Sequence, residues 1–242
     1  MAELTLPEDV EMPLEEHLVE LGKRLLLIGA FAGIITLAAF PYSGAIIRFL
    51  REGILPPGTK IIAMSPLEYL YVRIEVSIVV AALLCIPLLV YELFAFMKPG
   101  LFPSERRFFL RVIPGSVIFL FLGGIFSYYV ITPLITEGLL LYTERAAMPL
   151  LSLERFVSFV ASMLLIFGII FQMPMVVSLL VMADLIRLQD LTEKRKYAYA
   201  ILLLGGVLFT PDRVAIAPFI VTFVLLVMYE ISIIFAKAFL RS

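Results

Sequence analysis

The segment FAFMKPGLFPSERR, residues 94–107, decides the fold of this chain because it is a short polar connector between two long apolar runs. Pro99 and Pro103 each fix their own φ angle and lack a backbone donor, and each restricts the residue before it. Neither flanking helix can therefore run straight through the connector. The segment predicts a tight, stiff loop between two membrane helices.

The same connector concentrates charge in a chain that has little of it. It holds three bases and one acid, which are Lys98, Arg106, Arg107 and Glu105. A lone carboxylate among bases is unusual in a simple basic loop, so we interpret this loop as a candidate docking surface.

The composition predicts a polytopic membrane protein. Of the 242 residues, 62% are hydrophobic and 16% are charged, and the mean hydropathy is +1.06. Soluble domains carry about 25% charged residues. The net charge of -1 argues against a nucleic-acid-binding protein, which needs clustered surplus Lys and Arg.

The chemistry-bearing residues argue against an enzyme or a cofactor protein. Cys85 is the only cysteine and His17 the only histidine, so an intramolecular disulfide, a cysteine-rich metal site and HExxH-type zinc chemistry are excluded, and we expect no Ser/His/Asp triad from a single surface histidine. No P-loop pattern occurs, and the Asp residues fall at span ends or in loops. We expect no catalytic residues, no metal and no cofactor.

Apolar runs divide the chain into six candidate spans, because a span needs roughly 20 apolar residues to cross about 30 Å of hydrocarbon. The candidates are residues 25–47, 70–96, 108–135, 156–183, 197–209 and 214–235. We therefore expect one all-α membrane domain, residues 1–242, in which the fifth and sixth spans are short. The fifth would be only about 20 Å long, so either the bilayer thins there or that hairpin does not fully cross.

The basic residues set the orientation. Placing the N-terminus in the cytoplasm puts the larger share of the 19 Lys and Arg residues inside. Six spans then return the C-terminus to the cytoplasm. The two longer outer connectors, residues 48–69 and 136–155, are expected to form caps with short helices. Residues 1–24 are expected to be cytoplasmic and to include a short amphipathic helix on the inner membrane face, because apolar residues recur there at helical spacing.

Three polar residues within the spans are candidates for function, because such groups are costly in lipid. Gln172 lies in the fourth span, where it either bonds a neighbouring helix or lines a polar concavity. Glu92 and Glu230 lie near the cytoplasmic ends of their spans, within reach of water or of Lys98 and Lys237 respectively. A small secondary transporter with a path lined by these three is the alternative function, although no inverted repeat is visible.

Six motifs in order resemble the TatC family, the signal-peptide receptor subunit of the twin-arginine protein translocase. They are EEHLVELGKRL (15–25), SPLEYL (65–70), FAFMKPGLFPSERR (94–107), FGIIFQMP (167–174), FTPD (209–212) and YEI (229–231). The resemblance implies a curved, glove-like bundle of six helices in the plasma membrane. It also implies that the protein binds twin-arginine signal peptides of folded precursors and recruits TatA-type single-span proteins, with TatB-type proteins as further candidates. The working complex would be a homo-oligomer driven by the proton-motive force.

The resemblance assigns the signal-peptide site to Glu20, Glu105, Phe96, Arg106 and Arg107. Two adjacent guanidiniums need two separate carboxylates, which they match with planar donor forks. Phe96 would receive the apolar residue after the arginine pair. Arg106 and Arg107 would either hold Glu105 in place or face anionic lipid headgroups.

Simpler structural roles stand beside these assignments. Glu20 is correctly spaced for an ion pair with Arg24 four residues later, worth a few tenths of a kcal/mol, and Glu105 would be a solvated loop acid. On the outer side, the resemblance points to partner contacts at Ser65, Pro66, Glu68 and Asp212. The chain departs from the family pattern at Gly22, Glu75 and Gln172, where the family often has Arg, Lys and Glu.

Overall fold

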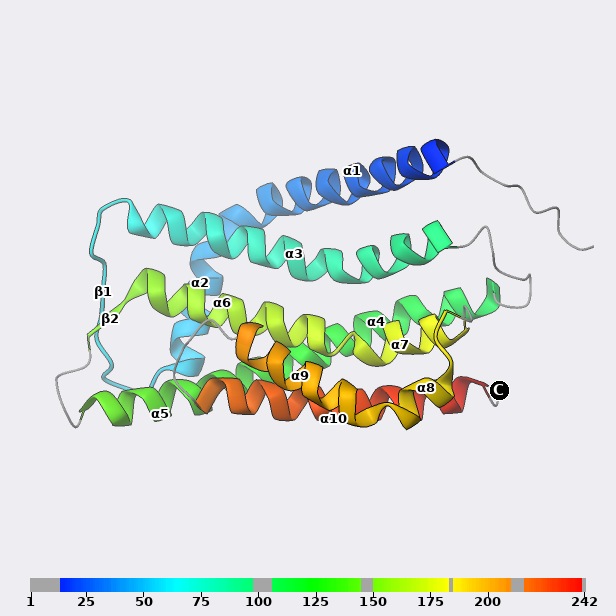
Figure 1. Cartoon of the computed structure of the whole chain (residues 1–242). Helices are drawn as coiled ribbons and strands as arrows, with labels where there is room; N and C mark the ends of the chain where they lie inside the picture. The colour runs from blue at the N-terminus through cyan, green and yellow to red at the C-terminus, as the bar shows by residue number, and fades with distance from the viewer. Residues whose placement is uncertain (1–13, 98–105, 145–149, 183–184, 210–215, 241–242) are drawn as a thin grey trace, which may run out of the picture.

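The computed structural model describes residues 14–97, 106–144, 150–182, 185–209 and 216–240. Side chains are described for residues 19–92, 114–143, 150–182, 185–208 and 217–238. Within these ranges almost all residues are helical (Figure 1).

The first helix does not divide into a surface helix and a span. We expected an amphipathic segment in residues 1–24 that is separate from the span, but α1 runs without a break over Leu14–Ala39. No proline interrupts residues 14–39, and its long side chains favour the helix throughout. A 3-10 turn, η1 (Phe40–Tyr42), contains Pro41 and changes the chain direction. Helix α2 (Ser43–Ile54) then crosses the ends of the longer helices (Figure 1).

The next two spans are longer than expected. Helix α3 covers Glu68–Met97 and contains Pro87. Helix α4 (Arg106–Phe126) continues through a π-helical stretch, η3 (Ser127–Ile131), into α5 (Thr132–Glu144). Half of the second outer connector is therefore the end of a helix rather than a cap.

The fourth span is broken in the middle. Helix α6 (Leu153–Ile170) is followed by a turn at Phe171 and Gln172, and then by α7 (Met173–Met182). Pro174 lacks a backbone donor, so the helical ladder cannot continue unbroken past it. The backbone N–H of Gln172 instead donates to the Ile169 carbonyl at 2.9 Å, which tightens the turn.

The last helices confirm only half of the expectation that the fifth and sixth spans are short. After α8 (Leu188–Glu193), α9 (Arg195–Phe209) has 15 residues and is about 22 Å long. However, α10 (Ile216–Leu240) has 25 residues and is not short. Its apolar run extends to Ala238, and Lys237 lies in its last turn, where a long basic side chain can reach the membrane surface.

Two short strands join the outer connectors. Strand β1 (Ile61–Ile62) pairs in parallel with β2 (Leu151–Ser152), with Ile61 opposite Leu151. The pair was not foreseen, because a two-residue strand leaves no periodic pattern in the sequence. It ties the loop after α2 to the residue before α6.

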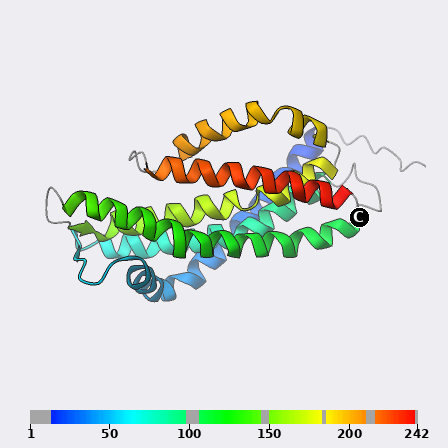
Figure 2. The ribbon, with the colours of Figure 1, turned by 90° about the horizontal axis from the view of Figure 1, so that it is seen from below.

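The helices form a bundle with two peripheral members. Helix α3 packs against α1, α4 and α6, and α10 packs against α7 and α9. Helix α1 contacts mainly α3, and α9 contacts mainly α10, so each lies at an edge of the bundle (Figures 1 and 2). The start of α1 and the end of α10 lie at one end of the bundle, and the strand pair lies at the other (Figure 1).

Buried apolar side chains form two main clusters. One joins α6 to α10 and includes Phe167 and Val221, both fully buried. The other lies beneath α2 and joins it to α3 and α6, with Val72 and Val157 fully buried. Close helix packing depends on Gly123 of α4, where an added Cβ would lie 2.6 Å from the Phe167 carbonyl oxygen.

Five helical stretches in the described part of the chain are long and apolar enough to span a membrane. They are Val19–Ile54, Glu68–Glu92, Pro114–Thr143, Leu153–Met182 and Ala217–Ala238. The first includes α2, which runs across the bundle. Helix α9 corresponds to the expected fifth span but is shorter than these stretches. The chain is therefore a helical membrane protein.

Candidate functional site

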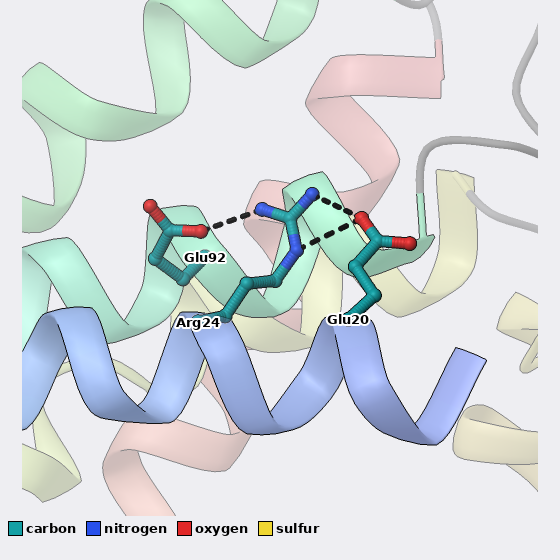
Figure 3. Close-up of polar contacts among 3 residues, drawn as sticks. All are labelled: Glu20, Arg24 and Glu92. Carbon is teal, nitrogen blue, oxygen red and sulfur yellow. Dashed lines mark hydrogen bonds and ion pairs between the residues drawn. The ribbon is translucent and has the colours of Figure 1, made fainter. Parts of the chain in front are cut away.

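A guanidinium held by two carboxylates is the most developed polar site near the start of α1. Arg24 donates from Nη1 to Glu92 Oε2 at 2.6 Å and from Nη2 to Glu20 Oε1 at 2.5 Å (Figure 3). Its Nε donates to the same Glu20 oxygen at 3.1 Å. We call Glu20, Arg24 and Glu92 the triad.

The local structure explains why these residues meet. Glu20 and Arg24 are four residues apart on α1, so they lie on one face of the helix. That face meets α3, and Glu92 lies near the end of α3 that packs beside the start of α1 (Figure 3). The side chains of Arg24 and Glu92 are 24% and 12% exposed, so solvent screens this link less than an ordinary surface pair.

The triad has more negative charge than positive. Two carboxylates share one guanidinium, which leaves a surplus of one negative charge within the triad. The second carboxylate oxygen of Glu20 points away from Arg24 (Figure 3). Among the residues that the structure describes, no donor reaches that oxygen. The site can therefore accept a further cationic donor at Glu20.

The other residues assigned to signal-peptide binding fall partly outside the described structure. Glu105 lies outside the described residues. Phe96 belongs to α3, and Arg106 and Arg107 begin α4, but their side chains are not among those described. The end of α3 and the start of α4 lie at the same end of the bundle as the start of α1 (Figure 1).

The pairing of Glu92 differs from the sequence expectation. We expected water or Lys98 beside it; Lys98 lies outside the described residues, and the partner that the structure describes is Arg24, 68 positions earlier in the chain. The expected ion pair of Glu20 with Arg24 is present. Sequence spacing reveals a pair within one helix, whereas the contact with Glu92 depends on how α1 packs against α3.

Gln172 makes the hydrogen bonds of a buried structural residue. Its side-chain oxygen accepts from Ser116 Oγ at 2.5 Å, and its Nε2 donates to the Ser116 carbonyl at 3.2 Å. Gln172 is 4% exposed and Ser116 is fully buried. Of the two alternatives, the bond to a neighbouring helix is the one observed, and it joins α4 to the break between α6 and α7.

Glu230 belongs to a second polar cluster, on α9 and α10. It accepts from Tyr199 Oη, and its other oxygen lies 3.2 Å from Arg195 Nη2. We expected water or Lys237 as a partner, but α9 supplies both described groups because it packs along α10. The neighbouring Tyr229 donates to the Leu191 carbonyl at 2.8 Å, which fastens α8 to α10.

The three residues of the alternative transporter path have separate partners. Glu92 is bonded to α1, Gln172 to α4 and Glu230 to α9. Within the described part of the chain, no three His, Cys, Asp or Glu side chains gather as metal ligands. The polar contacts therefore give no sign of one path through these side chains.

The outer-side motif at residues 65–70 is built around a buried carboxylate. Glu68 is 2% exposed and accepts from the backbone N–H groups of Met64 and Ser65 with one oxygen. Its other oxygen accepts from Ser152 Oγ at 3.1 Å and from the Glu154 backbone N–H at 2.9 Å. Glu68 thus joins the two outer connectors beside the strand pair.

The other residues assigned to outer-side partner contacts have fewer hydrogen bonds than Glu68 or lie outside the described structure. Ser65 Oγ accepts from the Leu67 backbone N–H at 3.3 Å, and Ser65 and Pro66 are both exposed just before α3 begins. Asp212 lies outside the described residues. Glu68 thus has a structural role, while the partner contacts at Ser65, Pro66, Glu68 and Asp212 stay a prediction.

Two charged residues of α3 have partners that sequence reasoning did not identify. Arg73 donates to Ser43 Oγ and to the Phe40 carbonyl, each at 2.9 Å, and its guanidinium lies over the Phe40 ring. Glu75 accepts from Ser158 Oγ at 2.8 Å. These bonds link α3 to the turn after α1 and to α6.

Comparisons with known proteins agree with this architecture. The family model described as Sec-independent protein translocase protein (TatC) matches residues 16–235. The chain is 35% identical to the Sec-independent protein translocase protein TatC of Aquifex aeolicus, covering 96% of this chain and 97% of the relative. It is 32% identical to the protein of that name from Methanocella arvoryzae, covering 96% of each chain.

A solved structure is similar over nearly the same length. The crystal structure of the twin arginine translocase receptor TatC superimposes with a TM-score of 0.79 at 32% sequence identity, and the match covers 92% of this chain and 98% of that one. The helical fold and the sequence therefore lead to the same family. The chain belongs to the TatC family of Sec-independent protein translocase proteins.

Proposed function

We propose that this chain is the subunit of the twin-arginine translocase that binds the twin-arginine signal peptides of folded precursors. The observation that carries the proposal is the triad: Glu20 and Glu92 already hold one guanidinium, that of Arg24, through charge-assisted bonds. A site that binds a guanidinium from its own chain has the chemistry to bind one from a peptide. The similarity to a twin arginine translocase receptor supports the same role.

Glu20 and Glu105 are the two carboxylates that we assign to the arginine pair. A guanidinium is always charged, and its planar donors match a carboxylate in a way that a lysine ammonium does not. Glu20 Oε2, which points away from Arg24, is the atom that a peptide guanidinium would reach (Figure 3). Phe96 would contact the apolar residue after the pair, and Arg106 and Arg107 would flank Glu105 or bind lipid headgroups.

The wider role is that of a non-enzymatic core subunit. In this proposal the chain forms six spans with a glove-like curvature in the plasma membrane and works as a homo-oligomer. It recruits TatA-type single-span proteins, with TatB-type proteins as further candidates, and the proton-motive force drives passage of the folded cargo. Ser65, Pro66, Glu68 and Asp212 are the proposed partner contacts on the outer side.

Both termini are proposed to be cytoplasmic. The described ends of the chain, the start of α1 and the end of α10, lie at one end of the bundle (Figure 1). Lys23 and Arg24 lie in the first half of α1, Arg195 begins α9, and Lys237 lies in the last turn of α10. Cytoplasmic loops carry the excess of Lys and Arg in membrane proteins, which supports this orientation.

The test uses the detergent-purified chain and a labelled signal peptide that carries Arg-Arg. Glu20→Gln and Glu105→Gln should each weaken peptide binding at least tenfold, on the order of the loss of one charge-assisted pair. Glu137→Gln is the control, because Glu137 is exposed on α5 near the other end of the bundle. Wild-type affinity in both site variants, with folding unchanged, would remove the site assignment.

A further inference from the structure

We infer that Glu92 is a positioning residue for signal-peptide binding: it holds Arg24 so that Glu20 keeps negative charge for an incoming guanidinium. This inference rests on the proposed function and adds a third carboxylate to its site. Glu92 does not contact the peptide in this account. It acts through Arg24.

The donor atoms of the Arg24 guanidinium are shared between the two carboxylates of the triad. Nη1 faces Glu92, whereas Nε and Nη2 both face a single oxygen of Glu20 (Figure 3). A bidentate fork would occupy both oxygens of a carboxylate. Because Arg24 uses only Oε1 of Glu20, the other oxygen stays directed away from the triad (Figure 3).

The charges of the triad also indicate that Glu92 leaves negative charge on Glu20 for the peptide. With Glu92 ionised, the triad carries two negative charges and one positive charge. Without the Glu92 carboxylate, Glu20 and Arg24 would form a neutral pair, and a peptide guanidinium would meet an acid that is already neutralised. At this partly exposed place a unit charge within a few ångströms alters the binding of a cation by about tenfold.

Burial explains why a second acid is needed. The Arg24 side chain is 24% exposed and lies where α1 meets α3, so carboxylate partners stabilise its charge more than they would at a fully exposed position. If Glu92 were absent, Arg24 would depend on Glu20 alone among the two acids of the triad. Glu92 is the less exposed of these acids, at 12% against 30% for Glu20. Glu92 is therefore suited to neutralise Arg24, and Glu20 to bind the peptide.

A purely structural role for Glu92, as a link between α1 and α3, makes a different prediction. In that case the link between the helices is absent from both double variants, so peptide affinity should stay weak whether Arg24 is replaced by Gln or by Lys. In our account, removing Arg24 restores the surplus negative charge at Glu20. Rescue by the second substitution therefore separates the two roles.

The experiment measures binding of the labelled Arg-Arg peptide to full-length purified variants. Glu92→Gln should weaken binding about tenfold. The double variant Arg24→Gln with Glu92→Gln should return to within about twofold of wild type, whereas Arg24→Lys with Glu92→Gln should stay weak because it keeps the positive charge. Glu230→Gln is the matched control. Glu230 lies on α10 and also pairs with an arginine, Arg195, so this variant should bind the peptide with wild-type affinity.

The outcomes are distinguishable. If wild type does not prefer Arg-Arg over Lys-Lys, the proposed function fails. If wild type has that preference but Glu92→Gln binds equally well, or if removing Arg24 brings no rescue, the inference about Glu92 fails alone. If Glu92→Gln does not fold, the two double variants still decide the matter, because equal affinity in both would contradict the role of charge.

Discussion

Arg24 Nη1 on α1 lies 2.6 Å from Glu92 Oε2 on α3, and this bond fastens the first helix to the bundle. Helix α1 packs mainly against α3, and its outward face exposes Leu26, Ile34 and Leu37. The link lies near the start of α1, in the part of the helix that carries Glu20. It therefore fixes the proposed peptide-binding acid relative to α3.

The link should contribute measurably to stability. In a double-mutant cycle of Arg24→Gln and Glu92→Gln, we expect a coupling free energy of about 1 kcal/mol, as for a well-formed, partly buried ion pair. Thermal unfolding in detergent would measure it. Strictly additive effects of the two substitutions would contradict a direct interaction.

The sequence predicted the helical elements well because apolar length is a local property. The apolar runs gave the bounds of α3, of α6 together with α7, and of α10 to within five residues at each end. Local reasoning also identified the pair of Glu20 with Arg24, which lie one helical turn apart. These features need no knowledge of how helices pack.

Features that depend on packing were missed or wrongly assigned. Water, Lys98 or Lys237 was expected beside Glu92 and Glu230, and Lys98 lies outside the described residues; the partners found in the described part of the chain are Arg24 and Arg195. Which helix lies beside α3 or α10 cannot be read from hydropathy. The same holds for the β1–β2 pair, whose strands are about 90 residues apart.

Two adjacent glycines of α4 should respond differently to alanine. An added Cβ at Gly123 would lie 2.6 Å from the Phe167 carbonyl oxygen, whereas nothing lies within 4 Å of one at Gly124. Gly123→Ala should destabilise by about 1–3 kcal/mol through overpacking of α4 on α6. Gly124→Ala should be neutral or stabilising by up to about 1 kcal/mol, because alanine favours the helix. Equal melting temperatures for the two variants would contradict the packing described.

The Ser116 and Gln172 pair should be sensitive to the loss of one partner only. Ser116→Ala leaves a buried amide without its donor, which should cost about 1–2 kcal/mol. Combining it with Gln172→Met removes both polar groups and should recover most of that loss, since two apolar groups of similar shape need no hydrogen bond. Unfolding temperatures of the three variants test this. A double variant less stable than Ser116→Ala would show that Gln172 has a further essential partner.

The outer connectors should depend on the Glu68 carboxylate. Glu68→Gln replaces one acceptor oxygen by a donor, which then faces N–H or O–H donors from residues 64–65 or from Ser152 and Glu154. We expect a loss of about 2–3 kcal/mol and faster proteolysis of the loop around β1. Glu154→Gln is the control, because the exposed side chain changes while its backbone donor remains. Loss of similar size in both variants would mean that charge, not hydrogen bonding, is responsible.

The most direct test of the account is the affinity of the purified chain for a labelled signal peptide with Arg-Arg, compared with the same peptide carrying Lys-Lys. The triad, in which Glu20 and Glu92 surround a guanidinium, predicts that the arginine peptide binds at least tenfold more tightly, because an ammonium lacks the planar donor fork. Equal affinity for the two peptides, measured on a folded and monodisperse protein, would contradict a guanidinium-selective site in this chain.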